Sequence, residues 1–348
     1  MANPSMSPQH PPTPARLRAL LKRATQRRIL VLGDVMLDQF IWGNVARISP
    51  EAPVPIVEFE RESFIPGGAA NVARNLAALG AQTSIYSVVG DDRAGEQLEN
   101  LLTAQAVGCR HLLRHPQRPT SIKTRIVAHR QQVVRVDRES REALDSAATR
   151  GLLAAISRNL EQCDAVIVGD YGKGVVSQTL LNSLKDLCHR QGVWLSLDPK
   201  PVHRLDLRRL SLITPNRKEA FELAELSDTT REKNPLSDAG LLRVAQKLLQ
   251  DLEPALLLIT LGEQGMLLCQ REREPIHIPT VAQEVFDVSG AGDTAIACFT
   301  LAIASGASPI EAAILSNHAA GVVVGKVGTA VVTPREILGS FIAPSPAA

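Results

Sequence analysis

Short apolar runs alternate with amphipathic stretches through most of this chain, and this alternation limits the possible folds more than any other feature. Six runs have the length and character of buried strands: residues 28–33, 84–89, 165–169, 193–198, 210–214 and 255–261. Helical patterns accompany them at residues 70–79, 95–107, 142–161, 177–190, 217–225 and 237–250. Apolar strands joined by amphipathic helices form βαβ units, in which helices cover both faces of a mostly parallel sheet. The predicted fold class is therefore α/β.

Two segments depart from this rhythm. Residues 53–58 form a strand-like piece with prolines, and residues 121–137 alternate polar and apolar side chains in two arms around 128–130. Such alternation is typical of a hairpin with one solvated face. We expect a small sheet here, within lid segments at about 40–62 and 120–138. Because a small sheet has edges and an apolar face that need covering, it would close over a site, form a dimer surface, or do both.

The composition restricts the class of partner. The net charge is +2 over 348 residues and aromatic residues make up 3%, which argues against nucleic acid and membrane surfaces. The five cysteines show no CxxC spacing, so we expect no disulfide framework or zinc site and a reducing, cytoplasmic location. Residues 1–14 and 342–348 are predicted to be disordered or loose tails. One domain would then span residues 15–341, beginning with a basic surface helix at 15–27.

The strongest chemical signal is the run from Gly290 to Thr294, Gly-Ala-Gly-Asp-Thr, before an apolar helical stretch at 295–304. Glycines at a helix start let the backbone approach a ligand, and the free N–H groups of the first turn bind anions. Asp293 puts a carboxylate where a phosphate would sit. That placement is explained if Asp293 removes a proton from a hydroxyl attacking the phosphate. The alternative is a structural carboxylate at a helix N-terminus.

The same run matches G-x-G-x-x-[GA], the dinucleotide fingerprint, so a nicotinamide-dependent dehydrogenase is an alternative of another class. That fingerprint requires a strand after the helix, with an acidic residue at its end about 20 residues on. Here a second helical pattern at 308–324 follows directly, with Glu311 in its first turn. This pattern disfavours the dehydrogenase. A Walker A motif does not occur in the sequence.

Other polar residues lie where predicted strands end or helices begin. In open α/β sheets, ligands bind beyond the carboxyl ends of the strands, so acids there can hold sugar hydroxyls. The candidates are Asp34 and Asp38 after the first strand, Asp170 and Asp198 after two later strands, and Asn71 behind the glycine pair Gly67-Gly68. We favour Asp38 over Asp34. Each has a structural alternative, as a turn or cap residue.

A further pair, Asn216 and Glu219, has the spacing of a helix capping box. The functional alternative is a carboxylate close to Mg²⁺-bound phosphates.

Taken together, residues 28–335 resemble the ribokinase-like sugar kinases of the PfkB family. The run 67–80, Gly-Gly-Ala-Ala-Asn-Val-Ala-Arg-Asn-Leu-Ala-Ala-Leu-Gly, with Gly90 ten residues later, looks like the first family signature. The run 287–294, Asp-Val-Ser-Gly-Ala-Gly-Asp-Thr, looks like the second. The resemblance implies a ribokinase-like fold with a small β-sheet lid. It also implies roles for the catalytic and sugar-binding residues: Asp293 as general base, the N–H groups of Gly290, Ala291 and Gly292 as anion hole, and Asp38, Gly67, Gly68 and Asn71 as sugar ligands.

The resemblance further implies an ATP site. Its cofactor-binding residues would be Asn216, Glu219, Thr260, Gly262, Gly265 and Asn317, the last near the adenine. Glu219 would organise Mg²⁺, and Asp287 would help to form a site for a monovalent cation such as K⁺.

Several runs are similar to one branch of the family, the bacterial heptose-7-phosphate kinases: residues 33–38, 47–55, 131–139 and 198–200. The resemblance implies ATP-dependent phosphorylation of D-glycero-β-D-manno-heptose 7-phosphate at O1, for ADP-heptose and lipopolysaccharide core synthesis. From the small sheet, we expect a homodimer joined through the lid. In many bacteria this kinase is fused to a nucleotidylyltransferase. We expect a monofunctional kinase here, with adenylylation by a separate protein.

A phosphate at the far end of the sugar requires cations. The candidates are Arg125, Arg135, Arg138, Lys173 and Lys200, of which we favour Arg138 and Lys200 because they lie in the most similar runs. The alternatives within the fold are a ribokinase, a phosphofructokinase or a nucleoside kinase, and the scarcity of aromatic residues disfavours the last. A non-catalytic sugar sensor is a further alternative, which the presence of Asp293 disfavours.

Overall fold

The computed structural model describes residues 11–129, 131–282, 285–326 and 328–342. Its centre is a nine-stranded sheet in the order β13-β12-β11-β10-β9-β8-β1-β4-β5. The strand pairs from β11 through to β5 are parallel, and β12 and β13 add in antiparallel fashion at one edge. The strands are β1 Arg28–Gly33, β4 Gln82–Gly90, β5 Val107–His115, β8 Ala165–Gly169, β9 Trp194–Asp198, β10 Leu212–Ile213, β11 Leu256–Thr260, β12 Met266–Cys269 and β13 Ile276–Ile278.

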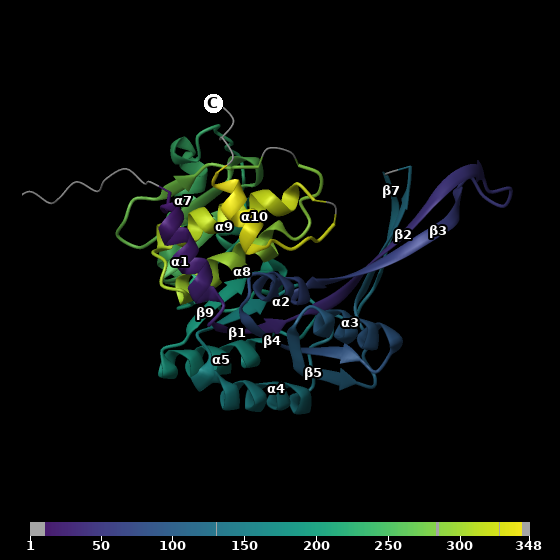
Figure 1. The fold of residues 1–348 in the computed structure, drawn as a ribbon, viewed down its shortest axis with the longest axis horizontal. Coiled ribbons are helices and arrows are strands. Elements are labelled where there is room, and N and C mark those ends of the chain that lie inside the picture. Colours follow the sequence, from purple (N-terminus) through teal and green to yellow (C-terminus); the bar gives the residue numbers. More distant parts are fainter. Residues whose placement is uncertain (1–10, 130, 283–284, 327, 343–348) are drawn as a thin grey trace, which may run out of the picture.

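Helices cover both faces of this sheet (Figure 1). One buried cluster joins the sheet to α1, α2, α3, α8, α9 and α10, and a second joins it to α4, α5, α6 and α7. Because successive side chains of a strand point to opposite faces, Ile29 and Val31 of β1 enter the first cluster, and Leu30 and Leu32 the second. The helices are α1 Pro14–Ala24, α2 Ala69–Ala78, α3 Arg93–Ala104, α4 Ser146–Asn159, α5 Gln178–Gln191, α6 Arg217–Leu223, α7 Ala239–Leu252, α8 Ala291–Ala304, α9 Pro309–Val324 and α10 Pro334–Ser340.

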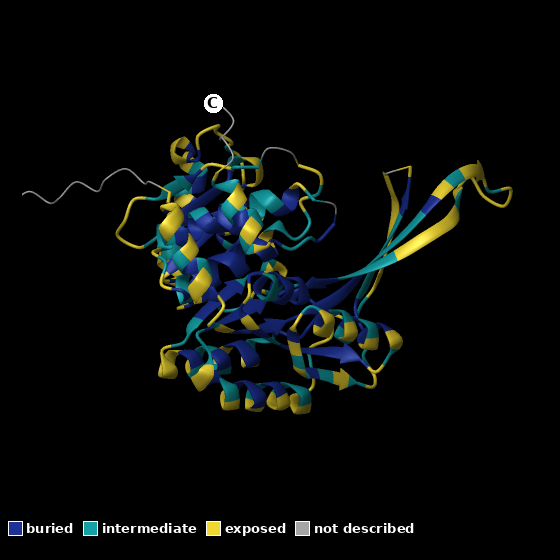
Figure 2. Ribbon diagram, viewed as in Figure 1, coloured by how far each residue is buried: buried dark blue, intermediate teal, exposed yellow. Residues whose placement is uncertain are grey.

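A second, four-stranded sheet forms the lid, in the order β3-β2-β6-β7. Its strands are β2 Val35–Ile48, β3 Pro55–Gly68, β6 Ile122–Ala128 and β7 Gln131–Arg138. The long strands β2 and β3 project from the main domain (Figure 1), and much of the lid surface is exposed (Figure 2). Only Asp34 separates β1 from β2, so the chain passes directly from the main sheet into the lid. This short connection places Asp38 at the base of the lid.

The predicted mostly parallel sheet, its flanking helices and the small lid sheet are confirmed. The strand at 53–58 is longer than expected, because β3 continues to Gly68. Three strands of the main sheet, β5, β12 and β13, were missed. In β5, at the sheet edge, charged residues and histidines replace the apolar run by which buried strands are recognised.

The expected loose tails lie mostly outside the described residues. Of residues 1–14, the structure describes 11–14, where the Thr13 hydroxyl accepts from the N–H of Arg16 and caps α1. Within the described ranges, no helix combines the length and the apolar character needed to cross a membrane.

Candidate active site

Asp293 lies in the first turn of α8, and its side chain is almost fully buried. The helix begins after Gly290, which has φ +81°. A Cβ at Gly290 would lie 2.7 Å from Nδ2 of Asn71, so both the backbone angle and the close approach require glycine there. This turn brings the start of α8 against the start of α2, where Asn71 lies.

Two donors hold the Asp293 carboxylate. Asn71 Nδ2 donates to Oδ2 at 2.8 Å, and the Tyr171 hydroxyl donates to Oδ1. Burial raises the pKa of Asp293, and the hydrogen bonds from Tyr171 and Asn71 oppose that rise. The nearby carboxylate of Asp38 raises the same pKa further, and the Arg74 guanidinium lowers it. Asp293 is therefore an oriented carboxylate of enhanced basicity, as a general base needs.

The predicted sugar ligands gather beside it. Asp38 is buried at the base of β2, and its Oδ1 lies 2.5 Å from Nη1 of Arg125 on β6. Burial raises the pKa of Asp38, and the Arg125 charge opposes that rise. A Cβ at Gly67 would lie 2.3 Å from Asp38 Oδ2, so this glycine leaves the carboxylate room. Gly68 is the N-cap of α2, and Asn71 lies in the first turn of that helix.

Two further predicted sugar ligands contact the loop after β8. The Asp34 carboxylate accepts the backbone N–H groups of Tyr171, Lys173 and Val175 at 2.9–3.0 Å. Asp170 accepts from the N–H of Gly172 and lies 3.0 Å from Nδ1 of His203. Burial raises the pKa of Asp170 to about 6. In the described structure, these carboxylates shape the loop that carries Tyr171.

A cavity of about 490 Å³ borders the turn at the start of α8. Its wall includes Ala291 and Gly292 of the predicted anion hole, together with four predicted nucleotide residues: Thr260, Gly262, Gly265 and Asn317. A Cβ at Gly292 would meet nothing within 4 Å, so the backbone there is open. The Ala291 N–H donates to Val288 O at 3.3 Å. Asn317 Nδ2 donates to Pro279 O at 2.7 Å, which fixes its amide.

The two remaining nucleotide residues form the predicted capping box of α6. Asn216 Oδ1 accepts from the N–H of Glu219, whose Oε2 accepts from the N–H of Asn216. A backbone bridge pairs Asn216 with Thr260, so this box adjoins the cavity wall. Asp198, at the end of β9, is close to Glu219 and Asp293, and desolvation together with these like charges holds its pKa well above the usual range. The predicted cation ligand Asp287 accepts the N–H groups of Ser289 and Gly328.

The side chains of the predicted phosphate-binding cations do not all lie together. Lys200 Nζ lies 3.2 Å from Glu219 Oε1, beside α6, whereas Arg138 lies 3.1 Å from Asp92 at the start of α3. Another set of cations is more enclosed. Glu139 Oε2 lies 2.5 Å from Lys173 Nζ and 3.6 Å from Lys123 Nζ.

Sequence reasoning missed Tyr171, Arg74 and Lys123. Tyr171 directly follows the candidate Asp170, and Arg74 lies one helical turn after Asn71. That spacing puts Arg74 and Asn71 on one face of α2, a signal that could have identified Arg74.

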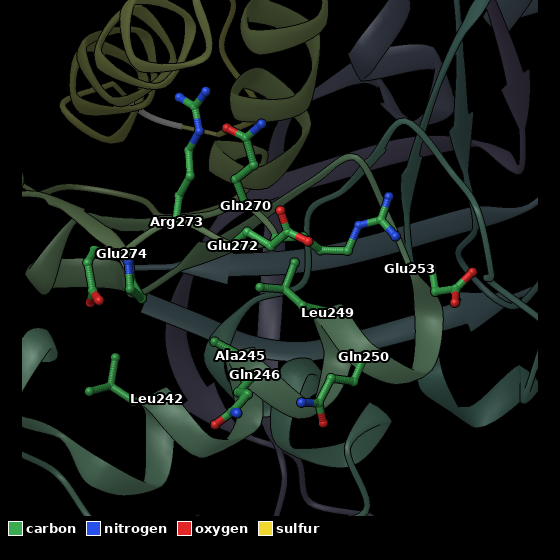
Figure 3. Close-up of a pocket in the computed structure, with 12 residues that line it drawn as sticks. Leu242, Ala245, Gln246, Leu249, Gln250, Glu253, Gln270, Glu272, Arg273 and Glu274 are labelled. Carbon is green, nitrogen blue, oxygen red and sulfur yellow. The ribbon is translucent and has the colours of Figure 1, made fainter. Parts of the chain in front are cut away.

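A larger cavity, of about 850 Å³, is lined by none of these residues. It lies between α7 and the turn that joins β12 to β13, where the side chains of Leu249, Gln250, Gln270 and Arg273 line it (Figure 3). Cavity size therefore does not single out the candidate site, which is defined by the oriented carboxylate and the open glycine turn.

Solved structures share this ribokinase-like fold. Phosphofructokinase-2 from Escherichia coli, in complex with substrates and products, matches with a TM-score of 0.75 and 20% identity over 91% of this chain and 98% of that one. Arabidopsis thaliana ribokinase, complexed with ribose and ATP, matches with a TM-score of 0.69 and 17% identity over 90% and 98%.

Other relatives have a higher sequence identity to this chain than these solved structures do. The bifunctional protein HldE of Geotalea uraniireducens is 42% identical over 325 residues, which are 93% of this chain and 65% of that protein. HldE of Caulobacter vibrioides is 45% identical over 311 residues, 89% of this chain and 62% of that protein. The chain therefore spans less than two thirds of the length of these relatives. The pfkB family of carbohydrate kinases matches residues 26–336, and the chain belongs to that family.

Proposed function

We propose that this carbohydrate kinase transfers the γ-phosphoryl group of ATP to O1 of D-glycero-β-D-manno-heptose 7-phosphate. The observation that carries the proposal is Asp293, held between the sugar-ligand cluster at the lid base and the glycine turn that borders the cavity. The similarity to the HldE proteins, at 42% identity in one case, supports a heptose substrate. A ribokinase or phosphofructokinase activity is the alternative within the family.

The chemistry follows from the positions of these groups. Asp293 accepts the proton of O1 while O1 forms a bond to the γ-phosphorus and the bond to the β,γ-bridging oxygen breaks, which releases ADP. The first-turn N–H groups of α8 stabilise charge on the transferred phosphoryl group. The Glu219 carboxylate has the oxygen ligands that Mg²⁺ prefers, and bound Mg²⁺ would neutralise phosphate charge. The lid excludes water from the acceptor.

Lys123 and Lys173 are the cations best placed for the 7-phosphate. Lys123 is the register partner of Asp38 across β2 and β6, and Lys173 lies two residues after Tyr171, which contacts Asp293. A sugar that reaches from Asp293 past Asp38 would direct its far end toward these two ammonium groups. Their attachment to Glu139 keeps them in position without a ligand, and a phosphate would offer them stronger acceptors.

Asp293→Asn tests the catalytic assignment. Removing a general base lowers turnover by about 10²- to 10⁴-fold, while ATP–Mg²⁺ should raise the melting temperature of the variant as much as that of the wild type. The assay follows ADP release with a panel of sugar phosphates. Near-normal turnover by the variant would refute the role of Asp293.

The same panel tests the substrate. Heptose 7-phosphate should give the highest kcat/KM, and a preference for ribose or fructose 6-phosphate would reject the heptose assignment but retain a sugar kinase. The dehydrogenase alternative is set aside, because the chain belongs to the pfkB family of carbohydrate kinases.

A further inference from the structure

Arg74 is a buried cation that connects three separate parts of the site. Its Nη1 donates to the backbone oxygen of Pro66 at 3.1 Å and to that of Thr329 at 3.2 Å. The same nitrogen donates to Oδ1 of Asn71 at 3.3 Å, and Nε donates to Oε1 of Gln105 at 2.6 Å. Burial lowers the pKa of Arg74 to about 10, so the guanidinium still carries its charge at neutral pH.

These contacts determine which way the Asn71 amide faces. An amide has one acceptor oxygen and one donor nitrogen. Because Arg74 donates to the oxygen, the nitrogen is directed at Asp293, to which it donates at 2.8 Å. With the amide reversed, its oxygen would face the Asp293 carboxylate and its nitrogen would face the guanidinium, so neither contact could form.

We propose that Arg74 is a positioning residue for phosphoryl transfer, which acts through the Asn71 amide to orient the Asp293 carboxylate. It touches neither Asp293 nor the reacting atoms. The inference rests on the proposed function of Asp293 and extends it to a residue in the helix opposite.

The charged and titratable groups around Asp293 define the expected pH effect. Arg74 is the cation that lowers the pKa of Asp293, and Asp38 at the lid base raises it. The Tyr171 hydroxyl is bonded to Asp293, and half-buried Asp198 on β9 lies near. Loss of Arg74 removes both its charge and its hold on Asn71. Each loss favours the protonated carboxyl, so the pKa of Asp293 should rise and the acidic limb of the kcat profile should move to higher pH.

The experiment compares Arg74→Gln and Arg74→Lys with the wild type. Arg74→Gln should lower kcat roughly 10- to 100-fold, because the base is misplaced, with little change in the KM for ATP. Arg74→Lys keeps the charge but has only one nitrogen for several acceptors, so it should restore the position of the acidic limb better than it restores kcat. An Asn71→Ala, Arg74→Gln double variant should lose much less than the product of the two single losses.

Gln105→Ala is the matched control, because it removes one partner of Arg74 and leaves the contact with Asn71. Its kcat and pH profile should match those of the wild type. A folded Arg74→Gln enzyme with a wild-type acidic limb, or fully additive losses in the double variant, would overturn the inference. If Arg74→Gln fails to fold, Arg74→Lys decides the question. A wild-type kcat together with a wild-type acidic limb of the kcat profile would overturn the inference. A lowered kcat with a near-normal acidic limb supports it.

A readout without substrate separates this inference from the proposed function. Carbon-13 NMR of aspartate carboxyls gives the pKa of Asp293 directly, with its resonance identified by its loss in Asp293→Asn. If no sugar phosphate is turned over but Arg74→Gln still raises this pKa, the proposed function fails and the link through Asn71 stands. If turnover requires Asp293 but neither the pKa of Asp293 nor kcat changes in the Arg74 variants, the proposed function stands and the link through Asn71 fails.

Discussion

At the scale of single residues, the site depends on how Tyr171 reaches Asp293. The Tyr171 backbone N–H donates to Asp34, and a Cβ added at Gly169 would lie 2.9 Å from the Tyr171 ring. The ring is thus fixed by its own loop, and its hydroxyl donates to Asp293 Oδ1. Asp34, a predicted sugar ligand, holds the loop that carries Tyr171 and so supports the proposed base in the described structure.

Tyr171→Phe should shift the pH dependence of turnover. The Tyr171 hydroxyl lowers the pKa of Asp293, and Asp293 must be ionised to accept a proton. Without the hydroxyl that pKa rises, so the acidic limb of kcat should move to higher pH, with a loss of about 5- to 10-fold at neutral pH, the effect of one hydrogen bond. Tyr86→Phe, at the other tyrosine of the chain, is the control and should leave the limb in place. An unmoved limb in Tyr171→Phe would contradict this role.

At the scale of elements, the loop after β8 meets the β6–β7 hairpin at Glu139. Lys173 comes from the loop and Lys123 from β6, and both lie close to Glu139 Oε2. Neither element alone brings two cations together, because each supplies only one ammonium group to Glu139. The anion site proposed for the 7-phosphate is therefore a property of their packing.

Lys173→Met and Lys123→Met should each weaken binding of the phosphorylated sugar. A hydrogen bond to a charged group contributes about 1.5–3 kcal/mol, which corresponds to a rise of about 10- to 150-fold in the KM for heptose 7-phosphate. The KM for ATP should change little. Lys185→Met is the control, since Lys185 is similarly enclosed but lies on α5 and contacts Asp206. Unchanged sugar-phosphate KM values in both site variants would place the phosphate elsewhere.

At the scale of the whole molecule, the lid exposes apolar side chains that a monomer would leave in water. Every described residue of β7 is exposed, including Val133, Val134 and Val136, and Phe59 on β3 is 64% exposed. Both outer strands of the lid, β3 and β7, are unpaired edges in the described chain. Exposed apolar strand edges mark association surfaces, so the homodimer through the lid remains our proposal.

A double variant, Val134→Glu with Val136→Glu, tests that dimer. Charges on this strand should disrupt association, so sedimentation equilibrium should shift from twice 37.5 kDa to 37.5 kDa. Val202→Glu, at a valine outside the lid that is more exposed than either of these, should leave the dimer intact. A wild-type protein that is monomeric at micromolar concentration would contradict the proposal.

Local sequence patterns determined most of the element types and the proposed chemical centre of this protein. Continuous apolar runs identified strands such as β1 and β8 to the residue, because full burial on both faces leaves a clear pattern. The glycine run identified Asp293 and the start of α8, because helix-start rules act within a few residues. Strand β5 and the roles of Asp34 and Lys123 gave no such local signal.

Only the tertiary structure decided what surrounds Asp293. Asn71 lies 222 residues away in the chain and Tyr171 lies 122 residues away, yet both donate to its carboxylate. Arg74, which donates to Asn71, also donates to Thr329, which lies 255 residues from Arg74 in the chain. Such contacts depend on the strand order that places β8 beside β1 and packs α2 against α8, and no local pattern encodes that order. The sequence by itself therefore determined the candidate base, and the packing of distant elements decided the groups that orient it.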